Sequence, residues 1–350
     1  MKTLNSMLKA ISFFIVSLSL VVHLQAREIN YTVEKIWDNG LYNSFTSLVK
    51  YKNQYYCAFR EGKSHIFDEN GKAEGKIRII SSPDGHRWQS VCLLGENGED
   101  YRDPQLSITP RGELMVSIGV SVYRDRKLVA QYPHVCFSTD GIRFSKPERC
   151  TIEEHGQDNR NWIWKLTWHN NIGYTVNYFP GQDGTNGLWL MSTVDGRHYT
   201  KIHAFNIPDH PSEATIRFLP DGQMALLIRR DGHNANGIWA TSAAPYTDWK
   251  LSEVPFHLGG PDFVVLDSTT TIAATRCHLV PRWCTTSVFK GNPQKGTWQQ
   301  LFVLPSGGDT SYPGILIDGK YLWISYYSTH EGPKASIYLA RIPIKTLKEF

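Results

Sequence analysis

The sequence predicts an all-β protein, a six-bladed β-propeller built from four-stranded antiparallel sheets. Three observations predict this fold: a short motif that repeats at a nearly constant interval, many short strand-like runs between turns, and a length that accommodates six such intervals. Because each unit of a repeat fold buries its core against its neighbours, we expect one closed domain.

The repeated motif reads hydroxyl residue, any residue, Asp-Gly, two residues, aromatic residue. Its copies are Ser82–Trp88, Ser138–Phe144 and Thr193–Tyr199, which begin 56 and 55 residues apart. Asp-Gly supplies the positive φ of a tight turn, the hydroxyl can bond to the turn backbone, and the aromatic ring can pack beneath. We therefore interpret the motif as structural and use it to count repeats.

The first 26 residues have the pattern of a secretory signal peptide. Lys2 and Lys9 give a positive start, residues 11–20 are mostly apolar, and Ala26 is a small residue at a cleavage point. The apolar run is too short for a membrane span. We expect residues 1–26 to be removed and residues 27–350 to form one secreted or periplasmic propeller domain.

The remaining chain is read as strands and turns. About 324 residues at about 55 per repeat give six repeats, each with room for four strands. Alternating or β-branched runs such as 113–120, 173–178 and 321–326 predict strands, and Pro220-Asp221-Gly222 is typical of a turn. Since no long segment has a helical apolar period, we expect almost no helix.

Charge and cysteine content exclude some classes of protein. The formal net charge is only +4, which argues against nucleic-acid binding or attachment to a membrane surface. We also expect the protein to be a monomer. The six cysteines have no zinc-site spacing. Because an exported protein can form disulfides, Cys277–Cys284 and Cys136–Cys150 are possible bridges, whereas Cys57 lies in a strand-like run and is expected to be buried and free.

The Asp-Gly motif, the repeat length and the export signal together resemble the sialidase superfamily, whose repeats carry Asp-boxes. The copies here are one residue shorter between the Asp and the aromatic residue. The resemblance implies an exo-acting glycoside hydrolase that removes a terminal acidic sugar from a glycan, without a metal or organic cofactor. Three arginines would hold the sugar carboxylate, a Tyr would attack, a Glu would take its proton, and an Asp would be the acid.

These residue types suit the chemistry. A guanidinium binds a carboxylate through two parallel hydrogen bonds. A carboxylate nucleophile would be repelled by the substrate's own charge by ~4 kcal/mol at 4 Å in a partly screened site. A neutral Tyr avoids this repulsion, but its pKa of ~10 requires a neighbouring base.

Several residues occupy the positions that the resemblance assigns. Arg60 ends the first strong strand, Glu213 and Arg229 bracket one hairpin, and Arg276 follows the strand-like run 271–275, with Arg282 in reserve. Tyr312 precedes the last strand–turn–strand unit. The resemblance therefore implies Tyr312 as nucleophile, Glu213 as its base and Arg60, Arg229 and Arg276 as the carboxylate-binding cluster.

The acid and the remaining substrate contacts are less sharply defined. His65 and Asp68 lie between Arg60 and the first motif copy, and either could protonate the leaving oxygen, although Asp68 also fits an exposed turn. Candidate substrate contacts are Arg102, Asp103, Trp164 and Lys165. Arg102 and Asp103 could instead be a structural ion pair, and Trp164 could belong to the core between blades.

Two other functions use the same residues. A polysaccharide lyase could use Tyr312 or His65 to remove a proton beside a uronate carboxylate that arginines neutralise. A propeller of this kind could also bind an acidic glycan without turnover, because the fold alone does not determine the activity.

Overall fold

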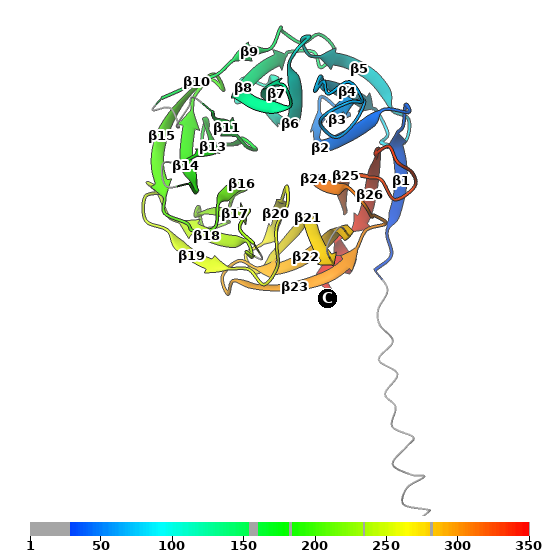
Figure 1. The fold of residues 1–350 in the computed structure, drawn as a ribbon. Helices are drawn as coiled ribbons and strands as arrows, with labels where there is room; N and C mark the ends of the chain where they lie inside the picture. The colour runs from blue at the N-terminus through cyan, green and yellow to red at the C-terminus, as the bar shows by residue number, and fades with distance from the viewer. Residues whose placement is uncertain (1–28, 154–159, 182–183, 234, 281–282, 350) are drawn as a thin grey trace, which may run out of the picture. The chain divides into compact units, whose positions relative to one another are not determined.

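The computed structural model describes residues 29–153, 160–181, 184–233, 235–280 and 283–349. The predicted signal peptide lies outside these residues. From Tyr31 onward the chain forms one compact unit, and its sheets are arranged as a ring (Figure 1).

The ring contains six sheets, which confirms the predicted all-β propeller. We number the blades in chain order; β2–β5 form blade 1, β6–β9 blade 2, β10–β15 blade 3, β16–β19 blade 4, β20–β23 blade 5, and β24–β26 with β1 blade 6. The strands are β1 (Thr32–Trp37), β2 (Tyr42–Tyr51), β3 (Gln54–Gly62), β4 (Lys76–Ser82), β5 (Gln89–Leu94), β6 (Asp100–Ile108), β7 (Leu114–Arg124), β8 (Lys127–Ser138), β9 (Glu148–Arg149), β10 (Thr151–Ile152), β11 (Trp162–Ile163), β12 (Thr167–His169), β13 (Ile172–Pro180), β14 (Asn186–Thr193), β15 (His198–Phe205), β16 (Pro211–Phe218), β17 (Met224–Arg230), β18 (Ile238–Ser242), β19 (Lys250–Glu253), β20 (Asp262–Asp267), β21 (Thr270–Val280), β22 (Trp283–Asn292), β23 (Thr297–Val303), β24 (Thr310–Asp318), β25 (Tyr321–Ser328) and β26 (Ser336–Pro343).

Most blades are four-stranded antiparallel meanders whose first strand lies nearest the centre of the ring (Figure 1). Blade 3 differs in two ways. Its inner position is divided between β11 and β12, which both pair with β13, and β10 adds to the outer strand β15 in parallel. The ring closes in blade 6, where β1 from the beginning of the chain pairs with β26 from its end.

The three motif copies form the turns between the third and fourth strands of blades 1 to 3. In each copy the Ser or Thr hydroxyl accepts the glycine N–H at 2.7–2.8 Å, and the Asp carboxylate accepts the next two backbone N–H groups. The glycines have φ of 75–77°. A Cβ on Gly85, Gly141 or Gly196 would lie 2.1–2.7 Å from a side chain on the second strand of the preceding blade, so each turn also docks one blade on another.

Apolar residues fill the spaces between blades, and this arrangement explains why the two proposed disulfides are wrong. All six cysteines are free thiols. Cys277 pairs in register with Thr285, while Cys284 pairs with His278, so the two side chains lie on opposite faces of the sheet. Cys136 and Cys150 belong to two different cores, one on each side of blade 2. Cys57 is buried, as expected.

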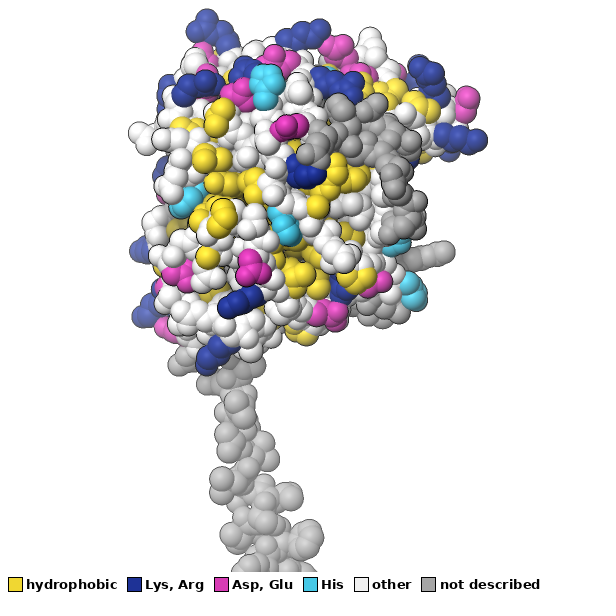
Figure 2. Space-filling model, turned by 90° about the vertical axis from the view of Figure 1, so that its left-hand side faces the viewer, with side chains coloured by type: hydrophobic (Ala, Val, Ile, Leu, Met, Phe, Trp, Pro, Cys, Tyr) yellow, Lys and Arg dark blue, Asp and Glu magenta, His cyan; other side chains and the backbone are white. Residues whose placement is uncertain are grey.

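The described residues contain a single short helix, α2 (Ile344–Lys348), and no helix among them is long and apolar enough to span a membrane. On the outer face near β10 and β15, Lys and Arg side chains are intermixed with Asp and Glu (Figure 2).

Candidate functional site

The site is built where the inner strands are interrupted. The pairing of β2, β6, β16 and β24 with their neighbours shifts register at one point each, and the looped-out segments contain Phe45, Asp103, Glu213 and Tyr312. Such a bulge turns a side chain away from the regular alternation of a strand. The corresponding places in blades 3 and 5 hold Trp164, between β11 and β12, and the Gly259–Gly260 segment that precedes β20.

Tyr312 and Glu213 meet across the ring. The Tyr312 hydroxyl donates to Glu213 Oε1 at 2.7 Å, and Arg229 Nη1 donates both to Glu213 Oε2 at 2.9 Å and to the Tyr312 oxygen at 2.8 Å. The Gly260 N–H donates to Glu213 Oε2 at 2.7 Å. A carboxylate, a phenol and a guanidinium thus form one closed hydrogen-bonded unit.

The electrostatics of this unit keep the proton on Tyr312 and the negative charge on Glu213 before a substrate binds. Burial and the Glu213 charge raise the pKa of Tyr312, while Arg229 and Arg276 partly offset this. Burial alone would raise the pKa of Glu213, but Arg229 and the hydrogen bonds that the carboxylate accepts lower it below its ordinary value. Glu213 is therefore ionised and directly placed to accept the phenolic proton.

The Tyr312 ring is enclosed on several sides. Phe45 and Trp164 pack edge-on against it, with ring centroids 4.9 and 5.9 Å away, and the Arg276 guanidinium lies 4.8 Å from its centre. A Cβ on Gly260, whose φ is +55°, would lie 2.4 Å from the ring. Only a glycine therefore permits this approach. Trp164 is fully buried and contacts Tyr312 rather than solvent.

Three of the candidate arginines lie around the Tyr312 site, and their side chains are 12 %, 20 % and 14 % exposed for Arg102, Arg229 and Arg276. Arg229 donates to the Tyr312 hydroxyl, Arg276 lies over its ring, and Arg102 lies over Phe45, which packs against that ring. Each guanidinium also contacts a carboxylate: Arg102 contacts Asp103, Arg229 contacts Asp231, and Arg276 contacts Asp309.

Arg60 takes a different position from the other three. Its side chain is only 1 % exposed and is held by the Asp100 carboxylate at 2.7 and 2.9 Å, while Nη1 donates to the Ser64 carbonyl. Asp100 also contacts Arg102 at 3.4 Å. Arg60 thus supports the loop that carries His65, and Arg102, predicted as a substrate contact, lies over Phe45, which packs against Tyr312.

His65 and Asp68 are separated by their surroundings. His65 Nδ1 lies 2.5 Å from Asp309 Oδ2, and its ring packs edge-on against Phe45, the residue that also touches Tyr312. Asp68 instead accepts the backbone N–H groups of Asn70 and Lys72 and contacts Lys63, which is the role of a turn residue.

Asp309 was not identified from the sequence, although it lies three residues before Tyr312. Its carboxylate receives Tyr42 and Tyr327 hydroxyls at 2.5 and 2.7 Å, in addition to His65 and Arg276. Burial alone would raise the pKa of Asp309, but these partners lower it. The sequence feature that could have indicated Asp309 is the Gly307-Gly308-Asp309 stretch, which lies just before the predicted nucleophile Tyr312.

Asp103 and Lys165 have contrasting environments. Asp103 has a φ of +48° and one buried carboxylate oxygen without a partner in the described part of the chain. Burial raises the pKa of Asp103 to about 6 despite Arg102. The Lys165 amino group is already paired: Nζ donates to the Pro313 carbonyl at 2.7 Å and contacts Asp262 at 2.8 Å. The reserve residue Arg282 lies outside the described residues.

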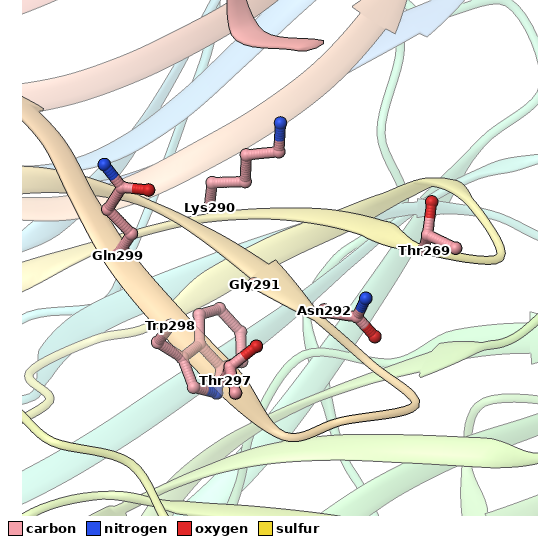
Figure 3. A pocket seen from close by; sticks show the side chains of 7 residues that line it. All are labelled: Thr269, Lys290, Gly291, Asn292, Thr297, Trp298 and Gln299. Atoms are coloured by element: carbon pink, nitrogen blue, oxygen red, sulfur yellow. The ribbon is translucent and has the colours of Figure 1, made fainter. Parts of the chain in front are cut away.

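Other hollows differ from this site. Lys165 and Asp262 line a cavity of about 290 Å³ with later residues of the inner strands, such as Val49, Ile108 and Leu316. A hollow of about 360 Å³ lies on the outer strands of blade 5, and its lining includes Lys290, Asn292, Trp298 and Gln299 (Figure 3). Among the residues that the structure describes, no three His, Cys, Asp or Glu side chains are grouped to hold a metal.

No protein-family model and no curated protein matches this sequence. Solved structures do match its fold. A protein of unknown function from Dyadobacter fermentans has a TM-score of 0.75 at 17 % identity, and the match covers 89 % of this chain and 99 % of that one. The sialidase of Trypanosoma rangeli has a TM-score of 0.68 at 9 % identity, covering 92 % of this chain but 61 % of the sialidase. An α-L-arabinofuranosidase of Fusarium graminearum has a TM-score of 0.64 at 13 % identity, covering 87 % and 93 %.

Proposed function

We propose that this protein, whose six-bladed fold matches structures of a sialidase and an arabinofuranosidase, is an exo-acting, retaining glycoside hydrolase that removes a terminal acidic sugar, with Tyr312 as the nucleophile and Glu213 as its base. The observation that carries the proposal is the Tyr312–Glu213 hydrogen bond of 2.7 Å at the centre of an arginine-lined site.

The residues would divide the reaction as follows. The Tyr312 oxygen bonds to the anomeric carbon as its proton passes to Glu213, and Arg229 stabilises the developing phenolate. Protonated His65, oriented by Asp309, gives its proton to the departing glycosidic oxygen. Water then cleaves the covalent sugar–tyrosine bond, His65 takes up the water's proton, and Glu213 returns its proton to Tyr312.

The substrate class follows from the charges around Tyr312. Arg102, Arg229 and Arg276 approach it from three blades, so a sugar carboxylate could sit among them. Asp103, whose Oδ1 has no partner in the described part of the chain, would contact a hydroxyl of the same sugar. The glycan would remain in solution beyond the terminal residue, and the reaction needs no metal or organic cofactor.

The test is trapping with a fluorinated analogue of an acidic sugar that carries a good leaving group. We expect mass spectrometry to find the sugar on the peptide that contains Tyr312, and NMR to show first-formed product with retained configuration. A sugar adduct on another residue, or an inverted product, would contradict the mechanism.

A lyase is the second candidate, and the His65–Asp309 contact favours it. A histidine oriented by a carboxylate is suited to removing a carbon-bound proton, with Tyr312 protonating the leaving oxygen. A lyase would release an unsaturated sugar that absorbs in the near ultraviolet, whereas the hydrolase would not. A non-catalytic glycan-binding protein would bind acidic glycans and release neither product.

A further inference from the structure

The backbone conformation of Tyr312 is not stabilised by the strand pairing of its own sheet. The β24–β25 pairing shifts between Ser311 and Gly314, and Ser311 and Tyr312 have φ of +95° and +49°. Residues other than glycine adopt positive φ only when the surrounding structure enforces it. The contacts that enforce it here must therefore come from outside the β24–β25 ladder.

Three side chains from other blades supply those contacts. The Thr46 hydroxyl of blade 1 donates to the Tyr312 carbonyl at 2.9 Å. Lys165 Nζ of blade 3 donates to the Pro313 carbonyl at 2.7 Å, and Asp262 Oδ2 of blade 5 accepts the Ile315 N–H at 3.0 Å. The segment that carries Tyr312 is thus held from across the ring.

Lys165 and Asp262 form a buried ion pair as well. Their charged atoms lie 2.8 Å apart, and their side chains are 9 % and 4 % exposed. Asp262 Oδ1 also accepts Arg217 Nη2 of blade 4 at 2.7 Å. A buried pair of this kind is seldom more stabilising than apolar residues of similar volume. What the pair provides here is two directed hydrogen bonds to the backbone on either side of Gly314.

We propose that Lys165 and Asp262 are positioning residues that hold the Tyr312 bulge in the geometry required for its hydrogen bond to Glu213. This inference rests on the proposed role of Tyr312 as nucleophile. It assigns Lys165 to the support of the reacting residue instead of to the sugar.

The experiment compares Lys165→Met with the double variant Lys165→Met/Asp262→Asn, which removes both charges of the pair and leaves Arg217, 24 % exposed, without this carboxylate partner. Lys50→Met is the matched control, because Lys50 forms a comparable contact of 2.8 Å with Asp318 at the far end of the same strand. Turnover of an activated acidic glycoside, thermal unfolding and a crystal structure are measured for each variant.

We expect Lys165→Met to lower kcat by roughly 10- to 100-fold, the loss typical of a reacting group misplaced by about 1 Å, while KM changes little. The double variant should remain as slow as Lys165→Met, because the Pro313 carbonyl still lacks the hydrogen bond from Lys165. Lys50→Met should retain the kcat of the unmodified protein.

Recovery of kcat in the double variant would overturn the proposal, since the pair would then serve stability alone. The crystal structures separate this failure from a failure of the proposed function. If the unmodified protein does not hydrolyse the substrate, a longer Tyr312–Glu213 distance in the two Lys165 variants would still support positioning, and an unchanged distance would overturn it.

Discussion

The Tyr312 hydroxyl donates a hydrogen bond of 2.7 Å to Glu213 Oε1, although 99 positions separate the two residues and blade 5 lies between their blades. The contact therefore spans the centre of the ring. Because both residues sit in bulges of inner strands, the same distortion of two sheets brings the phenol and the carboxylate together.

Replacement of Tyr312 by Phe removes only the hydroxyl. We expect kcat on an activated acidic glycoside to fall by roughly 10³-fold or more, because no other group is placed to form the covalent intermediate. The melting temperature should change little, since Phe45 and Trp164 still pack against the ring. Full activity in Tyr312→Phe would exclude the tyrosine as nucleophile.

Glu213→Gln keeps the size of the side chain but removes its negative charge. We expect kcat to fall by about 10²- to 10⁴-fold, because the amide cannot accept the proton of Tyr312. Arg229 would lose one of its two ionic partners, so KM is also expected to change. Steady-state kinetics measures both, and an unchanged kcat would contradict the role of Glu213 as base.

Arg229 and Arg60 are expected to behave differently when replaced by Met. Arg229→Met should weaken binding of an acidic sugar by roughly 10- to 100-fold, since a charge-assisted hydrogen bond is lost. Arg60→Met should instead lower the free energy of unfolding by about 3–5 kcal/mol, because the buried Asp100 carboxylate loses its two shortest ionic contacts and keeps only Arg102 at 3.4 Å.

Calorimetric titration of a Tyr312→Phe background and urea unfolding measure these two effects. Intact stability in Arg60→Met, together with lost sugar binding, would return Arg60 to the carboxylate-binding cluster.

Asp103→Asn should reveal a pH-dependent gain in stability. The pKa of Asp103 is raised to about 6 by burial, above its value of ~3.9 in an unfolded chain, so folding takes up a proton between these values. The ionised carboxylate therefore costs stability, at most ~3 kcal/mol, above pH 6 and not below pH 4. We expect the Asn variant to be the more stable one at pH 7.5 and equal to the unmodified protein at pH 4.

The control is Asp68→Asn, for which the opposite sign is expected. Backbone and Lys63 contacts lower the pKa of Asp68, so its charge stabilises the fold above the unfolded pKa, and this contribution is lost as pH falls. Urea unfolding across the pH range measures both variants. An effect of Asp103→Asn that is the same at every pH would contradict the raised pKa.

Gly260→Ala tests the contact between the glycine and the Tyr312 ring. A Cβ on residue 260 would lie 2.4 Å from the ring, so we expect Tyr312 to be displaced and kcat to fall. The φ of +55° adds ~1 kcal/mol of backbone strain to the folded state. Gly222→Ala is the control, since its φ is +84° with nothing within 4 Å. Equal activity in the two variants would show that Tyr312 tolerates the added methyl group.

The blade count and the turns could be predicted because they are properties of local sequence. Asp-Gly in each motif copy determines a turn wherever it occurs, and the spacing of the copies gives the repeat. The positions of Glu213 and Tyr312 beside predicted hairpins could be predicted for the same reason.

The ionic partners of the arginines could not be predicted from the sequence, because they depend on contacts between blades. Arg60 and Arg102 both end near Asp100, and which of them is buried with it is decided by packing around Gly62 and Gly75. The bulges that turn Asp103 and Tyr312 inward leave no turn signal other than the proline that follows each residue.

The pairing of β1 with β26 also determines when the site can exist during synthesis. Blade 6 contains Tyr312, and its outer strand comes from the earliest part of the folded chain. Nearly the entire described chain must therefore be synthesised before blade 6, the sheet that carries Tyr312, can be completed. Fragments that lack β1 or β26 are therefore expected to leave the sheet that carries Tyr312 incomplete.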